Sequence, residues 1–207
     1  MRRIVLILST MALTLVVASG VALAVNKMGT DGPDTLRGTN KADNLIGQGG
    51  NDIIFGGAGS DNLLGGSGKD ALFGGNEFGP SRGDMNLVGG SGNDFINAGQ
   101  GHDNAVGGEG NDLLIDGNLR ESSLDNLVGD SGNDVIVADH VPAFQDVVTC
   151  GTGYDRVIAD RKDTVAADCE KVVIVHGQLG EVIRQEGKFF DSIPQKFFDG
   201  LNPQIFG

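Results

Sequence analysis

Tryptophan is absent from this chain of 207 residues and tyrosine occurs only once, so a large aromatic-rich core is not expected. Positive charge is also scarce, because 15 Lys and Arg residues face 28 Asp and Glu residues, for a formal net charge of −13. Such a surface repels DNA, RNA and anionic lipid and suits hard cations. We therefore expect no nucleic-acid partner. Glycine is abundant, with 35 residues, but glycine and the five prolines together stay below the level typical of disordered chains.

The N-terminal segment has the pattern of a cleaved export signal. Arg2 and Arg3 precede an apolar run over residues 4–17, and Ala22-Leu23-Ala24 forms a small-x-small cleavage site. We predict that residues 1–24 are a signal peptide, with an uncleaved membrane anchor as the alternative. Cleavage would remove two arginines and no acids, and would leave a net charge of −15. The mature protein is expected to be secreted into the extracellular space, without membrane attachment, where disulfides persist.

Three consecutive nonapeptides in one register, within residues 47–73, define the repeat of this chain. Residues 47–73 read GQGGNDIIF, GGAGSDNLL and GGSGKDALF, with an aspartate at the sixth place and an aliphatic residue at the eighth. The register can be followed from Gly29 to about residue 165 as 14 units, of which the first two and last two are degenerate. A fixed period of nine residues predicts a solenoid.

The units alternate in type, which doubles the period. Odd units read Gly-Asn-Asp, as at Asn51-Asp52 and Asn93-Asp94, whereas even units place asparagine after the aspartate position, as at Asn62 and Asn104. Insertions occur only in even units, over residues 76–84, 118–124 and 139–145. We predict an all-β fold, a parallel β-roll that forms a right-handed two-sheet solenoid with two nonapeptides, or about 18 residues, per coil. Odd turns would stack along one edge and even turns along the other. The roll is expected over residues 25–175, with a C-terminal capping tail.

Each unit should divide into a glycine-rich turn and a short strand. Glycine allows positive φ and close backbone approach, and the aliphatic residues after the aspartate favour a strand. Because side chains alternate along a strand, the eighth residue should point inward. The expected core ladder is Ile54, Leu63, Leu72, Leu87, Ile96, Leu114, Leu127, Ile136, Val148 and Val157.

The odd turns place aspartates in one file that needs a cation. Carboxylates on neighbouring coils would lie roughly 5 Å apart, and their repulsion would cost about 3 kcal/mol per pair at an effective dielectric constant near 20. Only Lys69 and Arg156 flank the file, so basic side chains cannot neutralise it. Calcium accepts 6–8 oxygen ligands in loose geometry and fits such a file. The absence of thiolate or imidazole ligands argues against zinc or copper, and no EF-hand pattern occurs.

These units resemble the RTX (hemolysin-type) calcium-binding repeats, GGxGxDxUx, over about residues 29–165. The resemblance implies a parallel β-roll with several Ca²⁺ ions between stacked turns, which folds only when calcium is present. Asp125 and Asp146 take the motif position after insertions, and Asp34, Asp43 and Asp163 lie in turns poor in glycine. Met85 cannot be a carboxylate ligand, and the neighbouring Asp84 could substitute. The residues at the regular motif position are Asp52, Asp61, Asp70, Asp94, Asp103, Asp112, Asp134 and Asp155.

The two cysteines, Cys150 and Cys169, are separated in the sequence by about the length of one coil. They should therefore stack on adjacent coils, within the reach of a disulfide. We predict a disulfide on the last coil, with two free thiols as the alternative.

The C-terminal tail and the outer face of the odd strands carry apolar residues that the repeat itself does not explain. Residues 176–207 hold five of the ten phenylalanines and are expected to cap the open end or fold back along a face. Docking on a protein or cell-surface partner is the alternative. The outward positions of the odd strands should form an apolar stripe, which we expect the tail or another molecule to cover. The stripe comprises Ile53, Phe55, Phe73, Phe95, Leu113, Ile115, Val135 and Val137.

The sequence offers no convincing catalytic group. Gly129-Asp-Ser-Gly132 imitates a serine nucleophile segment but lies in repeat register, and no H-E-x-x-H occurs. A hydrolase site in the even-turn insertions would need a nucleophile and base that the sequence does not show. We predict a secreted, non-enzymatic calcium-binding protein. The alternative is a cell-surface adhesion or assembly module that uses the apolar sheet or the phenylalanine-rich tail.

Overall fold

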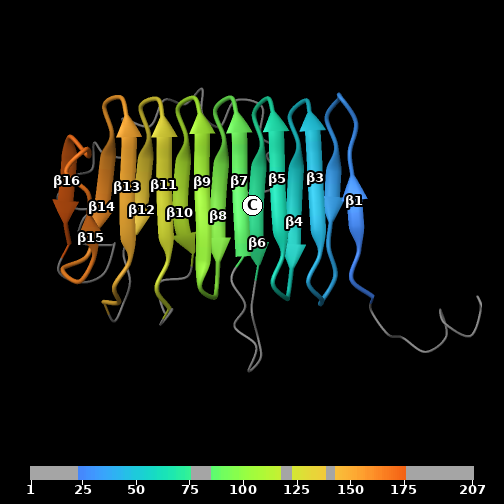
Figure 1. The fold of residues 1–207 in the computed structure, drawn as a ribbon, viewed down its shortest axis with the longest axis horizontal. Coiled ribbons are helices and arrows are strands. Elements are labelled where there is room, and N and C mark those ends of the chain that lie inside the picture. The colour runs from blue at the N-terminus through green and yellow to red at the C-terminus, as the bar shows by residue number, and fades with distance from the viewer. Residues whose placement is uncertain (1–22, 76–84, 118–122, 139–142, 176–207) are drawn as a thin grey trace, which may run out of the picture.

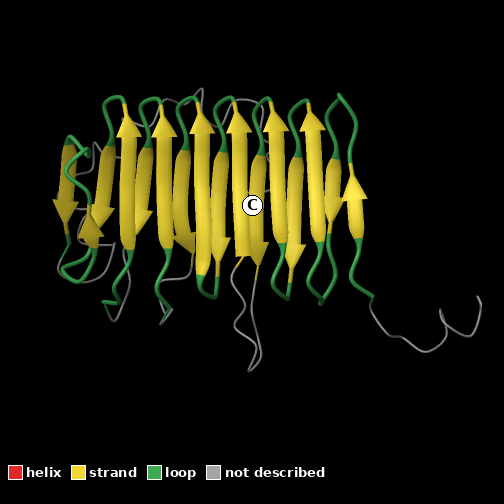
Figure 2. Ribbon diagram, in the orientation of Figure 1, coloured by secondary structure: helices red, strands yellow, loops and turns green. Residues whose placement is uncertain are grey.

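The computed structural model describes residues 23–75, 85–117, 123–138 and 143–175. Residues 1–22 and 176–207, which include most of the expected signal peptide and the whole tail, lie outside the described residues. Within the described ranges the chain forms 16 strands and no helix, so no helix there could cross a membrane. The strands build two eight-stranded parallel sheets, face to face, in an elongated roll (Figures 1 and 2).

Sheet A collects the strands that follow even turns, and sheet B collects those that follow odd turns. Sheet A consists of β1 (Asn26–Met28), β3 (Asn44–Gly49), β5 (Asn62–Ser67), β7 (Met85–Ser91), β9 (Asp103–Glu109), β11 (Asn126–Ser131), β13 (Val147–Thr152) and β15 (Thr164–Val165). Sheet B consists of β2 (Thr35–Arg37), β4 (Ile53–Gly57), β6 (Ala71–Gly75), β8 (Phe95–Gly99), β10 (Leu113–Gly117), β12 (Val135–Ala138), β14 (Arg156–Ala159) and β16 (Lys171–Ile174).

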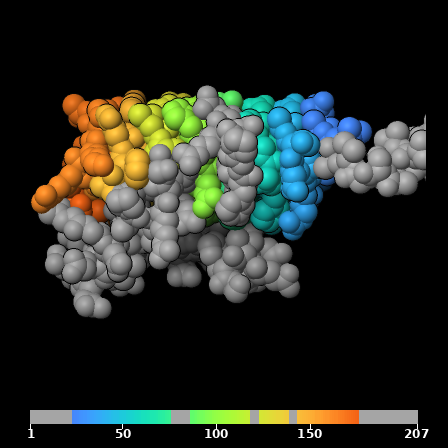
Figure 3. Space-filling model, turned by 90° about the horizontal axis from the view of Figure 1, so that it is seen from below, coloured from blue at the N-terminus to red at the C-terminus, as the bar shows by residue number. Residues whose placement is uncertain are grey.

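The doubled period, with two nonapeptides per coil, is confirmed by the pairing of the strands. In sheet A, Asn44 pairs with Asn62, and in sheet B, Ile54 pairs with Leu72. The coils follow one another in chain order along the roll, from the N-terminal to the C-terminal colours of Figures 1 and 3. Odd turns lie along the upper edge of Figure 1 and even turns along the lower edge. The predicted all-β parallel solenoid is therefore confirmed.

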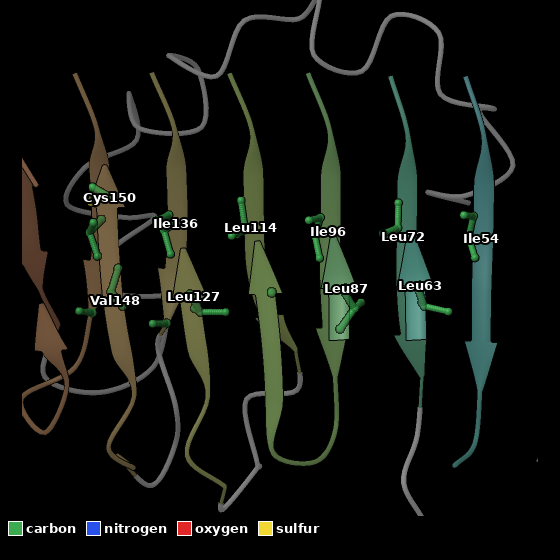
Figure 4. Close-up of a cluster of buried hydrophobic side chains, with 14 of the residues drawn as sticks. Ile54, Leu63, Leu72, Leu87, Ile96, Leu114, Leu127, Ile136, Val148 and Cys150 are labelled. Atoms are coloured by element: carbon green, nitrogen blue, oxygen red, sulfur yellow. The ribbon is translucent and has the colours of Figure 1, made fainter. Parts of the chain in front are cut away.

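The core is the predicted ladder of eighth residues. Figure 4 labels these side chains, except Val157, between the two sheets, and each of the ten ladder residues is at most 1% exposed. Leu45 and Ala105 continue the same ladder and are also fully buried. One large aliphatic side chain per half-coil thus fills the space between the sheets, because burial of apolar area is the main favourable term in such a narrow core.

Asparagines form a second ladder, on the outer face of sheet A. The Asn62 side-chain amide donates to Asn44 Oδ1 at 2.7 Å, and the Asn126 amide donates to Asn104 Oδ1 at 2.7 Å. Asn104 in turn donates to Asn86 Oδ1 at 3.4 Å. The asparagine that follows the aspartate in even units therefore links adjacent coils through its side chain.

Cys150 and Cys169 form a disulfide at the last coil, with their Cα atoms 5.2 Å apart. The bridge joins the end of the roll to the segment that leads into β16. We expect the double variant Cys150→Ser/Cys169→Ser to lose about 3 kcal/mol of unfolding free energy, since the bridge closes a loop of about 20 residues in the unfolded chain. Urea titration at saturating calcium measures the loss. An unchanged midpoint and slope would contradict this role.

Candidate metal centre

The odd turns carry an unbroken chain of carboxylates that we call the odd file. From Asp52 onward, each aspartate Oδ1 in the file accepts a hydrogen bond from the backbone N–H of the aspartate one coil before, at 2.8 Å in all six cases. The sequence separation varies from 18 to 24 residues, yet the bond length does not change. The odd file comprises Asp34, Asp52, Asp70, Asp94, Asp112, Asp134 and Asp155.

The even turns carry a second file, which is interrupted. The Asp43 N–H donates to Asp61 Oδ1 at 2.8 Å, and the chain resumes at Asp103, whose N–H donates to Asp125 Oδ1 at 2.6 Å. The missing place belongs to Met85, which is in register with Asp103. Asp84 lies outside the described residues. The even file comprises Asp43, Asp61, Asp103, Asp125, Asp146 and Asp163, the last bonded through the Asp146 N–H at 3.0 Å.

The second oxygen of most odd-file carboxylates is buried without a hydrogen-bond donor. This holds for Oδ2 of Asp52, Asp70, Asp94, Asp112, Asp134 and Asp155, and also for Oδ2 of Asp61 in the even file. These seven side chains are at most 1% exposed. A buried ionised carboxylate costs several kcal/mol unless a cation or a set of donors compensates it. The seven oxygens named here, six at the odd edge and one at the even edge, therefore demand positive charge at both edges.

Glycine makes the space in which these oxygens converge with backbone carbonyls. A Cβ at Gly107 would lie closer than 3.0 Å both to Asp112 Oδ2 and to the carbonyl oxygen of Gly129 on the next coil. The same pair of oxygens surrounds the first glycine of the other regular turns, for example Gly65 with Asp70 Oδ2 and the Gly89 carbonyl. Each turn thus brings one carboxylate and one carbonyl oxygen to a position that any side chain would fill. Carboxylate and carbonyl oxygens are the ligands that Ca²⁺ prefers.

Burial and mutual repulsion raise the pKa values of aspartates in the odd file. Burial, with a smaller effect from the charge of Asp70, raises the pKa of Asp94 to about 7. Burial, with the charges of neighbouring aspartates, raises the pKa of Asp112 to about 8. The backbone hydrogen bond to each carboxylate works in the opposite direction but is weaker than burial. Without a cation, these groups resist ionisation at neutral pH.

Asp34 and Asp43 lie in the files but differ from the other members. Thr30 donates from its N–H to Asp34 Oδ2 at 2.6 Å and from its hydroxyl at 2.9 Å. Thr39 makes the corresponding contacts to Asp43 Oδ2. A threonine at the second place of these turns, instead of glycine, satisfies the oxygen that is left bare elsewhere. The first two turns are therefore the poorest cation sites among the predicted residues.

The odd file does not end at Asp155, which the sequence did not reveal. The Asp155 N–H donates to Glu170 Oε2 at 2.8 Å, so that glutamate takes the place of the next aspartate. Asp168 accepts from the Gly151 N–H at 3.0 Å and lies over the same turn. Asp168 lies inside the loop that the Cys150–Cys169 disulfide closes, Glu170 directly follows that loop, and both fall outside the nonapeptide register. Their acidic character in an otherwise degenerate unit is the only sequence signal for them.

A further carboxylate, Asp116, enters the even edge from a non-motif position. It stands at the end of β10, where the neighbouring coils carry the small residues Ala98 and Ala138, and it is only 3% exposed. Carboxylate oxygens of Asp116, Asp125 and Asp146 lie within 4.8 Å of one another. Burial and the presence of Asp116 raise the pKa of Asp125 well above its ordinary value. An aspartate at a place that otherwise requires a small residue was the signal for this cluster.

A second set of side chains explains the Gly-Asn-Asp pattern of the odd turns. Asn111 Oδ1 accepts from the Asn133 N–H at 2.8 Å, and Asn133 Oδ1 accepts from the Tyr154 N–H at 2.8 Å. Asn93 and Asn51 accept from the next coil in the same way. These asparagines hold successive odd turns together, so the carboxylates beside them stay in line.

Comparison with protein families supports the same conclusion as this geometry. The RTX calcium-binding nonapeptide repeat matches in four copies, over residues 28–63, 47–77, 86–114 and 123–139. Comparison with curated proteins found no match for the chain. The matched residues contain the regular turns of both files except that of Asp155, and the described fold is the two-sheet roll that the motif implies. Residues 28–77, 86–114 and 123–139 of this chain are RTX calcium-binding nonapeptide repeats.

Proposed function

We propose that this chain is an exported, non-enzymatic calcium-binding protein whose roll folds as several Ca²⁺ ions bind. The observation that carries the proposal is the row of buried Oδ2 atoms that have no donor. Bound calcium would supply the positive charge that these oxygens lack. The residues proposed to hold it are the regular motif aspartates, together with the turn carbonyls beside them. Asp125 and Asp146 would contribute at the even edge.

Folding and binding are coupled in this proposal because the sites exist only in the stacked coils. A carboxylate from one turn meets a carbonyl from the next coil, and the unfolded chain holds no such pair. The free energy of binding to a site that the unfolded chain lacks is free energy of folding. Extracellular calcium modules bind with dissociation constants of about 0.1–1 mM, which would favour the unfolded chain before export and the folded chain after it. The disulfide is consistent with an extracellular location.

The alternative function, adhesion or assembly at a cell surface, needs an accessible apolar face. On sheet B several outward apolar side chains are buried, for example Leu113 at 3% and Ile158 at 0% exposure. This burial does not favour an open docking face, and calcium binding remains the function that the described residues support best.

A matched pair of variants tests the ligand role. Asp112→Asn removes the charge of a buried odd-file carboxylate, and Glu109→Gln removes the charge of an exposed acid on the adjacent strand. We expect Asp112→Asn to raise the calcium concentration for half-maximal folding roughly tenfold, because fewer charged ligands weaken a calcium site. Glu109→Gln should leave that concentration nearly unchanged.

Calcium titration of residues 25–207, followed by far-UV circular dichroism and by calorimetry, measures both variants. Equal calcium requirements for the two would contradict the assignment of the odd file as the metal centre. Folding that needs no calcium in either variant or in the unaltered chain would contradict the proposed function as a whole.

A further inference from the structure

One position of the even turns carries, at Asp116, a side chain that differs in kind from its neighbours along the roll. The strand register stacks five residues at this position, which we call the first-place column: Gly56, Gly74, Ala98, Asp116 and Ala138. Ala98 and Ala138 are fully buried, and Asp116 is only 3% exposed. Asp116 is thus a buried carboxylate at a position where the other four coils carry a methyl group or no side chain.

The glycines of the first-place column show what a side chain meets there. A Cβ at Gly56 would lie 2.6 Å from Asp61 Oδ2, in the same turn, and 2.6 Å from the carbonyl oxygen of Gly74 on the next coil. These are the two kinds of oxygen that converge in the regular turns. In its own turn, Asp116 therefore introduces a further carboxylate into the space where a motif carboxylate meets the next coil.

Two motif aspartates meet Asp116 in this space. Asp125 is the motif aspartate of the same turn, and Asp146 follows it one coil later, where its Oδ1 accepts from the Asp125 N–H at 2.9 Å. Carboxylate oxygens of the three residues lie within 4.8 Å of one another. Oxygens that bind one Ca²⁺ at roughly 2.3–2.6 Å can be at most about 5 Å apart, so a single ion can contact all three carboxylates.

One oxygen of this group is buried without a hydrogen-bond donor. Asp125 is 0% exposed, and its Oδ1 accepts from the Asp103 N–H at 2.6 Å, whereas its Oδ2 has no hydrogen-bond partner among the described residues. The side chains gathered with Asp125 are themselves acids, which repel an ionised carboxylate instead of stabilising it. A cation bound by all three carboxylates supplies the positive charge that the buried Asp125 requires.

We propose that Asp116, Asp125 and Asp146 form a three-carboxylate cation site, which binds Ca²⁺ and takes up a trivalent cation in preference to the regular turns. The inference rests on the proposed function, because the even turns must bind calcium for a third carboxylate to strengthen one of them. Two adjacent regular turns provide two motif carboxylates, and Asp116 adds a third here. Ligand charge tunes the affinity of a calcium site, and a higher ligand charge favours an ion of higher charge.

Displacement of calcium by Tb³⁺ in the folded full chain tests the site. Tb³⁺ is added stepwise to the calcium-loaded protein, from below one equivalent per chain upward, and the bound Tb³⁺ and the released calcium are measured after equilibrium dialysis. We expect the first equivalent of Tb³⁺ to bind at least roughly tenfold more tightly than the following ones, because the three-carboxylate site has the highest ligand charge.

Asp116→Ala should abolish this first tight equivalent. The substitution introduces the residue that both adjacent coils already carry, at Ala98 and Ala138, so the roll is expected to fold in calcium. Glu109→Ala removes the same charge from an exposed position and should retain the tight equivalent. Asp116→Asn keeps the shape of the side chain and one oxygen ligand, and should weaken the first equivalent roughly tenfold without abolishing it. It replaces Asp116→Ala in the comparison where circular dichroism shows that the alanine variant does not fold.

The outcomes separate this site from the proposed function. A first equivalent that binds equally tightly in the Asp116 variants and in the unaltered chain would overturn the site, although the roll still binds calcium. Protons or a basic side chain would then neutralise the three carboxylates. Loss of the tight equivalent in Glu109→Ala as well would also overturn the site, because net charge alone would explain the preference. An unaltered chain that folds and binds no calcium would contradict the proposed function itself.

Discussion

Removal of calcium at pH 8 is expected to unfold the roll, and acidification of the calcium-free chain to about pH 5 is expected to restore part of its strand signal. The reason lies in the buried carboxylates of the two files. Their pKa in the folded chain rises above the ordinary value of 3.8, to about 7 for Asp94 and about 8 for Asp112. The pKa values of Asp61, Asp70 and Asp134 rise to about 6 for the same cause, their burial.

The direction of the pH effect follows from these shifts. Between about pH 4 and pH 8 the calcium-free folded chain holds protons that the unfolded chain has released, so its stability falls as the pH rises. The contribution is fully present below the unfolded pKa and is lost as the pH passes through 6 to 8. Calcium removes this pH dependence, because it binds the ionised carboxylates and the unfolded chain is ionised as well. The dissociation constant of calcium for the folded roll should fall between pH 5 and pH 8, because fewer protons must leave the carboxylates when calcium binds.

Far-UV circular dichroism and hydrodynamic radius, with chelator and with calcium at pH 5 and pH 8, measure this prediction. The chain with calcium at pH 5 is the control for direct effects of acid on the roll. A calcium-free chain that keeps the same compact, strand-rich form at pH 8 would show that the cation is not required for folding. A calcium-free chain with no gain at pH 5 would contradict the role given to the buried aspartates.

Gly110→Ala is expected to be among the most damaging single substitutions that leave charge unchanged. Gly110 has φ of +132°, and a Cβ there would lie far inside van der Waals contact with the carbonyl oxygen of Gly92. Left-handed backbone strain alone costs about 1–3 kcal/mol, and the overlap would force adjacent odd turns apart. We expect a loss of about 4 kcal/mol or more in unfolding free energy, which few substitutions reach.

A matched glycine provides the control. Gly32 lies in the first odd turn without positive φ, and the nearest heavy atom to a Cβ there is Thr30 Oγ1 at 3.8 Å. Gly32→Ala should therefore fold as the unaltered chain does. Urea titration at saturating calcium compares the two. Similar midpoints for both variants would mean that the stacked turns tolerate side chains, contrary to the geometry of the odd edge.

Most of the fold could be predicted because the same residue type recurs at the same position of each repeat. The aliphatic position of Ile54 and Leu63 predicts which side chains stack in the core, and the different positions of Asn51 and Asn62 in their units distinguish the odd edge from the even edge. The same repetition places the regular aspartates in files. In each case many repeats show the same pattern, and together they predict the strands that a single short segment would predict only weakly.

The remainder could not be predicted because it depends on contacts outside the repeat. Asp168, inside the loop that the disulfide closes, and Glu170, directly after it, reach the odd edge from outside the repeat register. Asp116 becomes a neighbour of Asp125 and Asp146 across an insertion whose path the register does not specify. Thr30 and Thr39 satisfy their aspartates through a hydroxyl and an N–H at 2.5–3.0 Å, a detail that a motif position does not encode.

The odd turns keep one hydrogen-bond length while the chain between them grows from 18 to 24 residues. The added residues fall between strands whose ends meet at the opposite edge, as between β6, which ends at Gly75, and β7, which begins at Met85. The odd edge thus keeps the spacing between coils constant, and the even edge tolerates insertions of different lengths. Foreign peptides spliced into the even turns should be displayed in a row at a spacing set by whole coils.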